Sequence, residues 1–184
     1  QYKGLKGIRA PTKRERELAS SGRIACHLAA PALCQGSKIG VVTLATLAEI
    51  RDDFALLDDW EDRYRYVIEL GRQLPEIPES MRTEANKVRG CASQVWISTN
   101  ISEDNGQRRL HFQGDSDSHI VKGLIAVLFV LYQDETPDEI LQRDPQAVFK
   151  EFGLAEHLTQ QRSNGLASMV ARIRADATAA SATV

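Results

Sequence analysis

The chain contains 184 residues, 42% of them hydrophobic and 26% charged, and its formal net charge at pH 7 is −2. This composition is typical of a soluble globular protein with one domain of ordinary size and an appendage. The longest apolar run, residues 123–132, is shorter than the ~20 residues that a bilayer requires, which excludes a chain that crosses a membrane by itself.

The charge is distributed unevenly along the chain. Residues 1–44 contain eight lysines and arginines against two acidic residues, a balance of +6, so the rest of the chain carries −8. An acidic domain repels a phosphate backbone. We therefore expect no nucleic-acid binding by the part of the chain that follows residue 44.

Residues 1–42 mix basic residues with Gly, Ser and Ala and show no sustained hydrophobic period, so we expect a basic, disordered extension. Its acid-poor composition has features of an organellar transit peptide. The chain begins with Gln1, however, and a tag remnant, a misassigned start or a natural extension would look similar. The expected location is the cytoplasm, with organellar import left open.

The chain has three cysteines, Cys26, Cys34 and Cys91. An odd, sparse number of cysteines without a clear secretory signal argues against a disulfide framework and for a reducing compartment. Cys26-His27 and Cys34 do not have the spacing of a common zinc site, so we expect no metal there.

Two helices are expected at the start of the domain. Hydrophobic residues recur at steps of three and four over residues 47–57, which is the pattern of an amphipathic helix. Asp58 and Asp59 interrupt this pattern and are suited to cap a second helix, which ends near Gly71.

A small antiparallel sheet of about three strands is expected next. Apolar and polar residues alternate over 94–101 and again over 109–113, the period of half-buried strands. Between them, Asn105-Gly106 is a strong hairpin signal because both residues tolerate positive φ. Residues 86–89 are interpreted as a third, shorter strand that leads into a turn at Gly90-Cys91.

Helices are expected again after the sheet. Residues 116–133 are apolar nearly all round, which predicts a central helix buried against the sheet. Gly123 within it costs about 1 kcal/mol relative to alanine, which close backbone packing would explain, and Lys122 is expected to snorkel. Shorter helices begin at residues 136 and 145, and a last one contains residues 166–173. Together, these helices and strands predict an α+β fold with one core over roughly residues 43–177. The domain itself is assigned to residues 43–184.

Cys91 is the single cysteine of this domain, and it follows Gly90, which permits a tight turn. A thiol on such a turn, supported by the strand after it, can be presented to another protein. Only the thiolate attacks sulfur, and Lys87 and Arg89 are close enough in sequence to favour it. The alternative is that Cys91 is a small buried hydrophobic residue. Local sequence leaves both interpretations open.

Six segments, in order and spacing, resemble the SufE family of proteins associated with Fe–S metabolism. They are residues 60–71, 74–75, 88–96, 114–117, 120–124 and 157–166. The most specific is Gly-Cys-Ala-Ser-Gln-Val-Trp at residues 90–96. The resemblance covers residues 43–177, about three-quarters of the chain, and does not include the extension.

This resemblance implies a small antiparallel sheet packed by helices, a fold similar to that of IscU-type scaffolds. It implies that Cys91 carries persulfide sulfur, taken from a PLP-dependent cysteine desulfurase and passed on to an iron–sulfur scaffold complex. The desulfurase would be of the SufS or CsdA type, and sequence does not decide between them. PLP belongs to that partner, so no cofactor is expected here, and the chain is expected to act as a sulfur-transfer partner rather than a stand-alone enzyme.

Four further residues are candidates for partner contacts: Arg89, Asp117, His119 and Arg162. Arg162 is expected in the first turn of the last helix, where a cation is mildly unfavourable, which suggests a role in contacting the desulfurase or the Cys91 turn. His119 is also expected in a first turn and could reach that turn. A surface arginine, a half-exposed histidine and a helix-start acid at Asp117 remain the simpler alternatives.

Three other functions are open to such a chain. A binding-only module would activate the desulfurase without carrying sulfur. An iron–sulfur scaffold needs about four soft ligands, and the domain offers one cysteine. A cysteine hydrolase needs a histidine partner, and none can be paired with Cys91 from sequence. The oligomeric state and the resting position of Cys91 are also left open.

Overall fold

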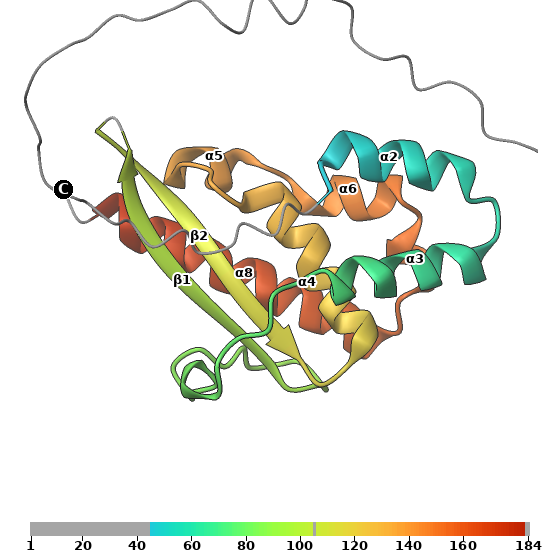
Figure 1. Ribbon diagram of the computed structural model, residues 1–184, viewed down its shortest axis with the longest axis horizontal. Helices are drawn as coiled ribbons and strands as arrows, with labels where there is room; N and C mark the ends of the chain where they lie inside the picture. Colours follow the sequence, from blue (N-terminus) through green and yellow to red (C-terminus); the bar gives the residue numbers. More distant parts are fainter. Residues whose placement is uncertain (1–44, 105, 183–184) are drawn as a thin grey trace, which may run out of the picture. The chain divides into compact units, whose positions relative to one another are not determined.

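The computed structural model describes residues 45–104 and 106–182, which form an α+β domain (Figure 1). Its helices are α2 (Leu47–Leu56), α3 (Trp60–Arg72), α4 (His119–Tyr132), α5 (Pro137–Gln142), α6 (Pro145–Glu151), α7 (Leu154–His157) and α8 (Gln160–Ala182), with a 3-10 turn at Glu79–Met81. Its strands are β1 (Val95–Asp104) and β2 (Gln107–Ser116). This order confirms the expected fold class. The predictions for residues 1–42, including those for Cys26 and Cys34, lie outside the described residues.

The sheet is one antiparallel hairpin, in which Val95 pairs with Ser116 and Asp104 pairs with Gln107. Gly106 in the turn has φ of 76°, a left-handed conformation that glycine adopts without steric cost. The hairpin therefore turns where the sequence predicted it.

The third strand expected over residues 86–89 is shorter than predicted. The segment forms one isolated bridge with β1, at Lys87 and Trp96, with backbone hydrogen bonds of 2.9 and 2.8 Å on either side. Turns directly before and after the segment leave no room for a longer ladder. The regular sheet thus has two strands, and the bridged segment extends its edge beside the start of β1.

The core lies between one face of the hairpin and the helices. Ile97, Leu110 and Phe112 point to this face and are buried. Helix α4 packs on β2 and α8 on β1, with α3 on the far side of α4 (Figure 1). Because α4 is buried on nearly every side, it is the central helix that its sequence predicted.

Helices α3 and α4 approach each other through two glycines. A Cβ atom on Gly123 would lie 2.1 Å from the carbonyl oxygen of Val67, and one on Gly71 would lie 2.5 Å from the Gly123 amide nitrogen. A side chain at either position would separate the helices. Close backbone packing therefore explains the glycine within α4, as expected.

Helix ends follow local chemistry. Thr46 and Glu49 form a reciprocal capping box at the start of α2, and Thr136 and Glu139 form another at α5. The side chain of Asp59 caps α3, as predicted. None of the described helices is both long and apolar enough to cross a bilayer.

Candidate functional site at the Cys91 loop

Residues 89–94, here called the Cys91 loop, connect the bridged segment to β1. Gly90 has φ of 91°, so the tight turn expected there requires glycine. At the base, the Val88 amide donates to the Val95 carbonyl at 2.9 Å. The loop is therefore the end of a small hairpin with a closed base and Cys91 near its tip.

The tip of the loop rests on the first turns of α8. A Cβ atom on Gly165 would lie 2.5 Å from the Cys91 Sγ, and one on Gly90 would lie 2.7 Å from the Ser168 Oγ. Cys91 is half-buried and packs against the hydrophobic core. At rest the thiol thus lies on the backbone of α8 at a place that only glycine leaves open.

Asp117 fixes the strand side of the loop. Its carboxylate accepts a hydrogen bond from the Gln94 amide at 3.0 Å, and its own amide donates to the Gln94 carbonyl at 3.3 Å. Asp117 precedes Ser118, the N-cap of α4, so it lies just outside the helix. A structural role at the base of the loop explains this residue without a partner contact.

The two cations before Cys91 contact the same carboxylate. Glu84 lies 3.6 Å from the Lys87 ammonium and 3.3 Å from the Arg89 guanidinium. Arg89 is largely exposed, with 83% of its side chain accessible. Exposed ion pairs of this kind contribute about 0–1 kcal/mol, so Arg89 remains accessible to a partner.

A buried charge cluster that the sequence did not reveal lies beneath the base of the loop. The Asp115 carboxylate, 5% exposed, accepts from Arg82 and from Lys122 at 2.7 Å each. Lys122 therefore pairs with a buried acid rather than snorkelling. The Arg82 guanidinium also lies over the ring of Trp96, 5.7 Å from its centroid.

The charge state of Asp115 follows from these contacts. Burial by itself would raise the pKa of Asp115, but the hydrogen bonds from Lys122, from the Ser116 amide and from Arg82 outweigh burial and lower that pKa. The carboxylate is ionised at neutral pH. It ties the end of β2 to the first turns of α4 and to Arg82, which follows the 3-10 turn.

Helix α8 also contacts the segment that precedes the Cys91 loop. The Arg172 guanidinium donates to the Ala85 carbonyl at 3.0 Å and pairs with Asp176 at 3.0 Å. Asp176 in turn accepts from the Thr99 hydroxyl at 2.6 Å. These contacts join residues far apart in sequence, which local patterns do not predict.

Arg162 and His119 occupy the helix first turns expected for them, in α8 and α4 respectively. Arg162 is half-buried and His119 exposed. Within the described residues, neither side chain has a hydrogen bond or ion pair to the Cys91 loop. The structure therefore does not place either residue in polar contact with the Cys91 loop. Partner contact stays a prediction for both.

His111 belongs to a separate arrangement on the outer face of the sheet. Its ring nitrogens contact the Ser102 hydroxyl at 2.6 Å and the Asp134 carboxylate. Of the three histidines that the structure describes, none is hydrogen-bonded to Cys91. The described residues also contain no group of three or more His, Cys, Asp or Glu side chains that could hold a metal ion.

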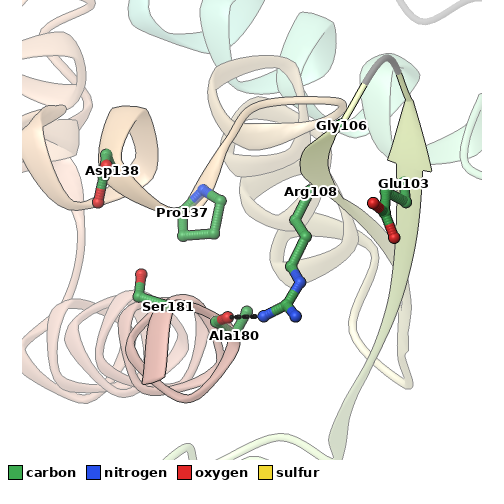
Figure 2. A pocket seen from close by; sticks show the side chains of 7 residues that line it. All are labelled: Glu103, Gly106, Arg108, Pro137, Asp138, Ala180 and Ser181. Atoms are coloured by element: carbon green, nitrogen blue, oxygen red, sulfur yellow. Dashed lines mark hydrogen bonds between the residues drawn. The ribbon is translucent and has the colours of Figure 1, made fainter. Parts of the chain in front are cut away.

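A cavity of about 410 Å³ lies at the far end of the hairpin (Figure 2). Arg108 crosses it and donates to the Ala180 carbonyl at 2.8 Å, which satisfies an acceptor at the C-terminal end of α8. Glu103 lies beside it. A ten-residue strand spans roughly 30 Å, so this cavity is well separated from Cys91 and belongs to the anchoring of α8.

The sequence and the fold place the chain in a family. Residues 48–177 match the family model of SufE, described as the Fe-S metabolism associated domain. This match covers most of the chain and includes the whole Cys91 loop. The chain belongs to the SufE family.

Individual relatives agree with this assignment. The chain is 54% identical to an uncharacterized SufE-like protein of Rhizobium etli over 134 residues, which are 73% of this chain and 90% of the relative. It is 52% identical to an uncharacterized SufE-like protein of Rhizobium meliloti, over 73% of this chain and 96% of the relative. A hypothetical protein from Thermus thermophilus has a similar solution structure, with a TM-score of 0.57 and 21% identity over 72% of this chain and 93% of that chain. This last likeness shows the fold alone.

Proposed function

We propose that this chain carries sulfur as a persulfide on Cys91. It accepts the sulfur from a PLP-dependent cysteine desulfurase, stimulates that enzyme's turnover and delivers the sulfur to an iron–sulfur scaffold complex. The observation that carries the proposal is the position of Cys91, the one cysteine of the SufE-like segment, near the tip of a glycine turn. A reduced thiol is required, which fits the cytoplasm.

The transfer step follows thiol–disulfide exchange. The Cys91 thiolate attacks the outer sulfur of the donor's persulfide, a new S–S bond forms on Cys91, and the donor's cysteine leaves as a thiolate. The proton of the outer sulfur stays with it, so no external oxidant or reductant is needed. The donor supplies PLP and the cleavage of free cysteine, and this chain supplies the acceptor thiol.

The packing of Cys91 supports a transfer in which the tip of the loop moves. The Cys91 Sγ has to approach the outer sulfur along the line of the donor's S–S bond. In this structure the Sγ lies against Gly165. An added sulfur extends the side chain by about 2 Å, and on the α8 side the Sγ already lies against Gly165. The base of the loop is held by paired hydrogen bonds, so the tip is the part that turns outward.

Intact mass spectrometry tests the proposal most directly. The reduced full chain is incubated with a cysteine desulfurase and L-cysteine, and we expect a gain of one sulfur atom that peptide mapping assigns to Cys91. The chain provides matched controls, because Cys26→Ser and Cys34→Ser remove the other two thiols. Both variants should gain sulfur as the natural chain does, and Cys91→Ser should not.

Desulfurase turnover separates this proposal from activation by binding alone. We expect the natural chain to stimulate alanine formation and Cys91→Ser to bind without stimulating it. Full stimulation by Cys91→Ser, with no sulfur gained by the natural chain, would replace the carrier role with a binding-only role.

A further inference from the structure

A second concave surface adjoins the proposed site on the other side of α8. It is a cavity of about 420 Å³ between α6, α7 and residues 163–174 of α8. Its walls are mostly apolar and include Phe149, Leu158, Leu166 and Val170. Mostly apolar cavities of this size with a few polar groups are typical binding sites.

Helix geometry places this cavity close to the Cys91 loop. The Cys91 thiol lies against Gly165, and the next residue of α8, Leu166, lines the cavity. The exposed residues Asn164 and Ala167 form the ridge between the two sites. A helix is about 10 Å across, so the two sites are roughly one helix width apart.

The size of protein interfaces links the two sites. A stable interface covers about 800 Å² of each partner, a patch roughly 30 Å wide. A partner that engages Cys91 over the α8 ridge therefore also covers the mouth of the cavity. An exposed apolar cavity within such a patch is where an anchoring side chain gives most binding energy.

Arg174 indicates the chemistry of the occupant. It lines the cavity, and its guanidinium donates to the carbonyl oxygens of Leu141 and Arg143 at 3.2 and 2.9 Å. Within the described residues no carboxylate pairs with it. A half-buried cation without a counter-ion favours a ligand that brings a negative charge.

We propose that this cavity is a second docking point for the sulfur-donating enzyme, which inserts an apolar side chain beside a carboxylate that pairs with Arg174. This inference rests on the proposed function, because it identifies the partner as the sulfur donor. It assigns to the cavity the affinity of the complex, and it leaves the transfer chemistry to Cys91.

The test fills the cavity and measures affinity apart from chemistry. Ala167→Trp and Ala155→Trp place an indole in the cavity from two different helices, and Ala55→Trp places one on the exposed face of α2, which does not line the cavity. Binding of each variant to the desulfurase is measured by calorimetry in the Cys91→Ser background, where no sulfur moves. We expect a loss of at least tenfold for the two filling variants and none for Ala55→Trp.

A second measurement keeps the outcomes distinct. With Cys91 present and the desulfurase saturating, the filling variants should gain persulfide at the natural rate. Equal affinity of all three tryptophan variants would overturn the docking point, whatever happens at Cys91. So would a dimer of this chain that Ala167→Trp dissociates, because the occupant would then be a second copy. Binding by the natural chain without sulfur gain would instead contradict the proposed function.

Discussion

At its base the Cys91 loop is held by hydrogen bonds and ion pairs, whereas its tip contacts α8 through van der Waals packing alone. The base has the Gln94–Asp117 hydrogen bonds and, below them, the buried carboxylate of Asp115 with two cations. At the tip, Cys91 and Gly90 contact Gly165 and Ser168 without a hydrogen bond within the described residues. Breaking a paired buried group costs several kcal/mol, while lifting a half-buried thiol costs little. The difference allows the tip to move on a base that stays in place.

The largest expected effect is at the base. Asp115→Asn leaves Lys122 without its acidic partner and leaves Arg82 paired with Glu79 alone. We expect a loss of about 2–3 kcal/mol in the free energy of unfolding, below the value for fully buried pairs because both cations are partly exposed. Urea denaturation measures it. Glu103→Gln, at an exposed carboxylate, is the matched control and should change the unfolding free energy by less than about 0.5 kcal/mol. Equal effects would show that the cluster does not fix the base.

The same carboxylate gives the base a pH dependence. The pKa of Asp115 is lowered in the folded state, so its contribution is complete above the unfolded value of about 3.9 and is lost as pH falls through the folded value. We therefore expect the stability difference between the natural chain and Asp115→Asn to be constant from pH 7 to 5 and to shrink below pH 4. Urea midpoints at several pH values measure it. A difference that grows on acidification would contradict the ionised state of Asp115.

Asp117→Ala loosens the strand side of the base. It removes the acceptor of the Gln94 amide, and we expect a loss of about 1 kcal/mol in unfolding free energy together with faster alkylation of Cys91. The rate with iodoacetamide in a Cys26→Ser, Cys34→Ser background reports Cys91 alone. A variant in which stability falls and the alkylation rate does not change would limit Asp117 to a purely structural role.

Much of this arrangement could be predicted, and the remainder has a physical reason. The period of 3.6 in the helices, the alternation in β1 and β2 and the glycine turn before Cys91 are local signals, and the structure follows them. The contact between Cys91 and Gly165 joins positions 74 residues apart, and no local pattern specifies it. The same holds for the Asp115 cluster, which depends on how α4 meets the sheet. The third strand was overestimated because turns take up both ends of the short segment at residues 86–89 and leave one bridge to β1.

Gly165→Ala tests the tip of the loop. A Cβ atom there would lie 2.5 Å from the Cys91 Sγ, an atom at the end of a side chain that can turn away. Because alanine also favours the helix by about 1 kcal/mol, we expect little net change in stability, but a several-fold faster alkylation of Cys91. A double-mutant cycle with Cys91→Ala isolates the contact in the unfolding free energy. Additive effects would mean that the thiol does not rest on Gly165.

The smallest expected effect separates packing from charge at the tip. Glu84→Gln releases Lys87 and Arg89, which raises the positive potential near Cys91. Because these groups are mostly exposed and screened, we expect the unfolding free energy to change by a few tenths of a kcal/mol and alkylation to accelerate by less than about twofold, with the gain disappearing in high salt. Alkylation rates at low and high ionic strength measure it. If Glu84→Gln accelerated alkylation as much as Gly165→Ala, charge rather than contact with α8 would restrain the thiol, and the contrast between a paired base and a packed tip would have to be abandoned.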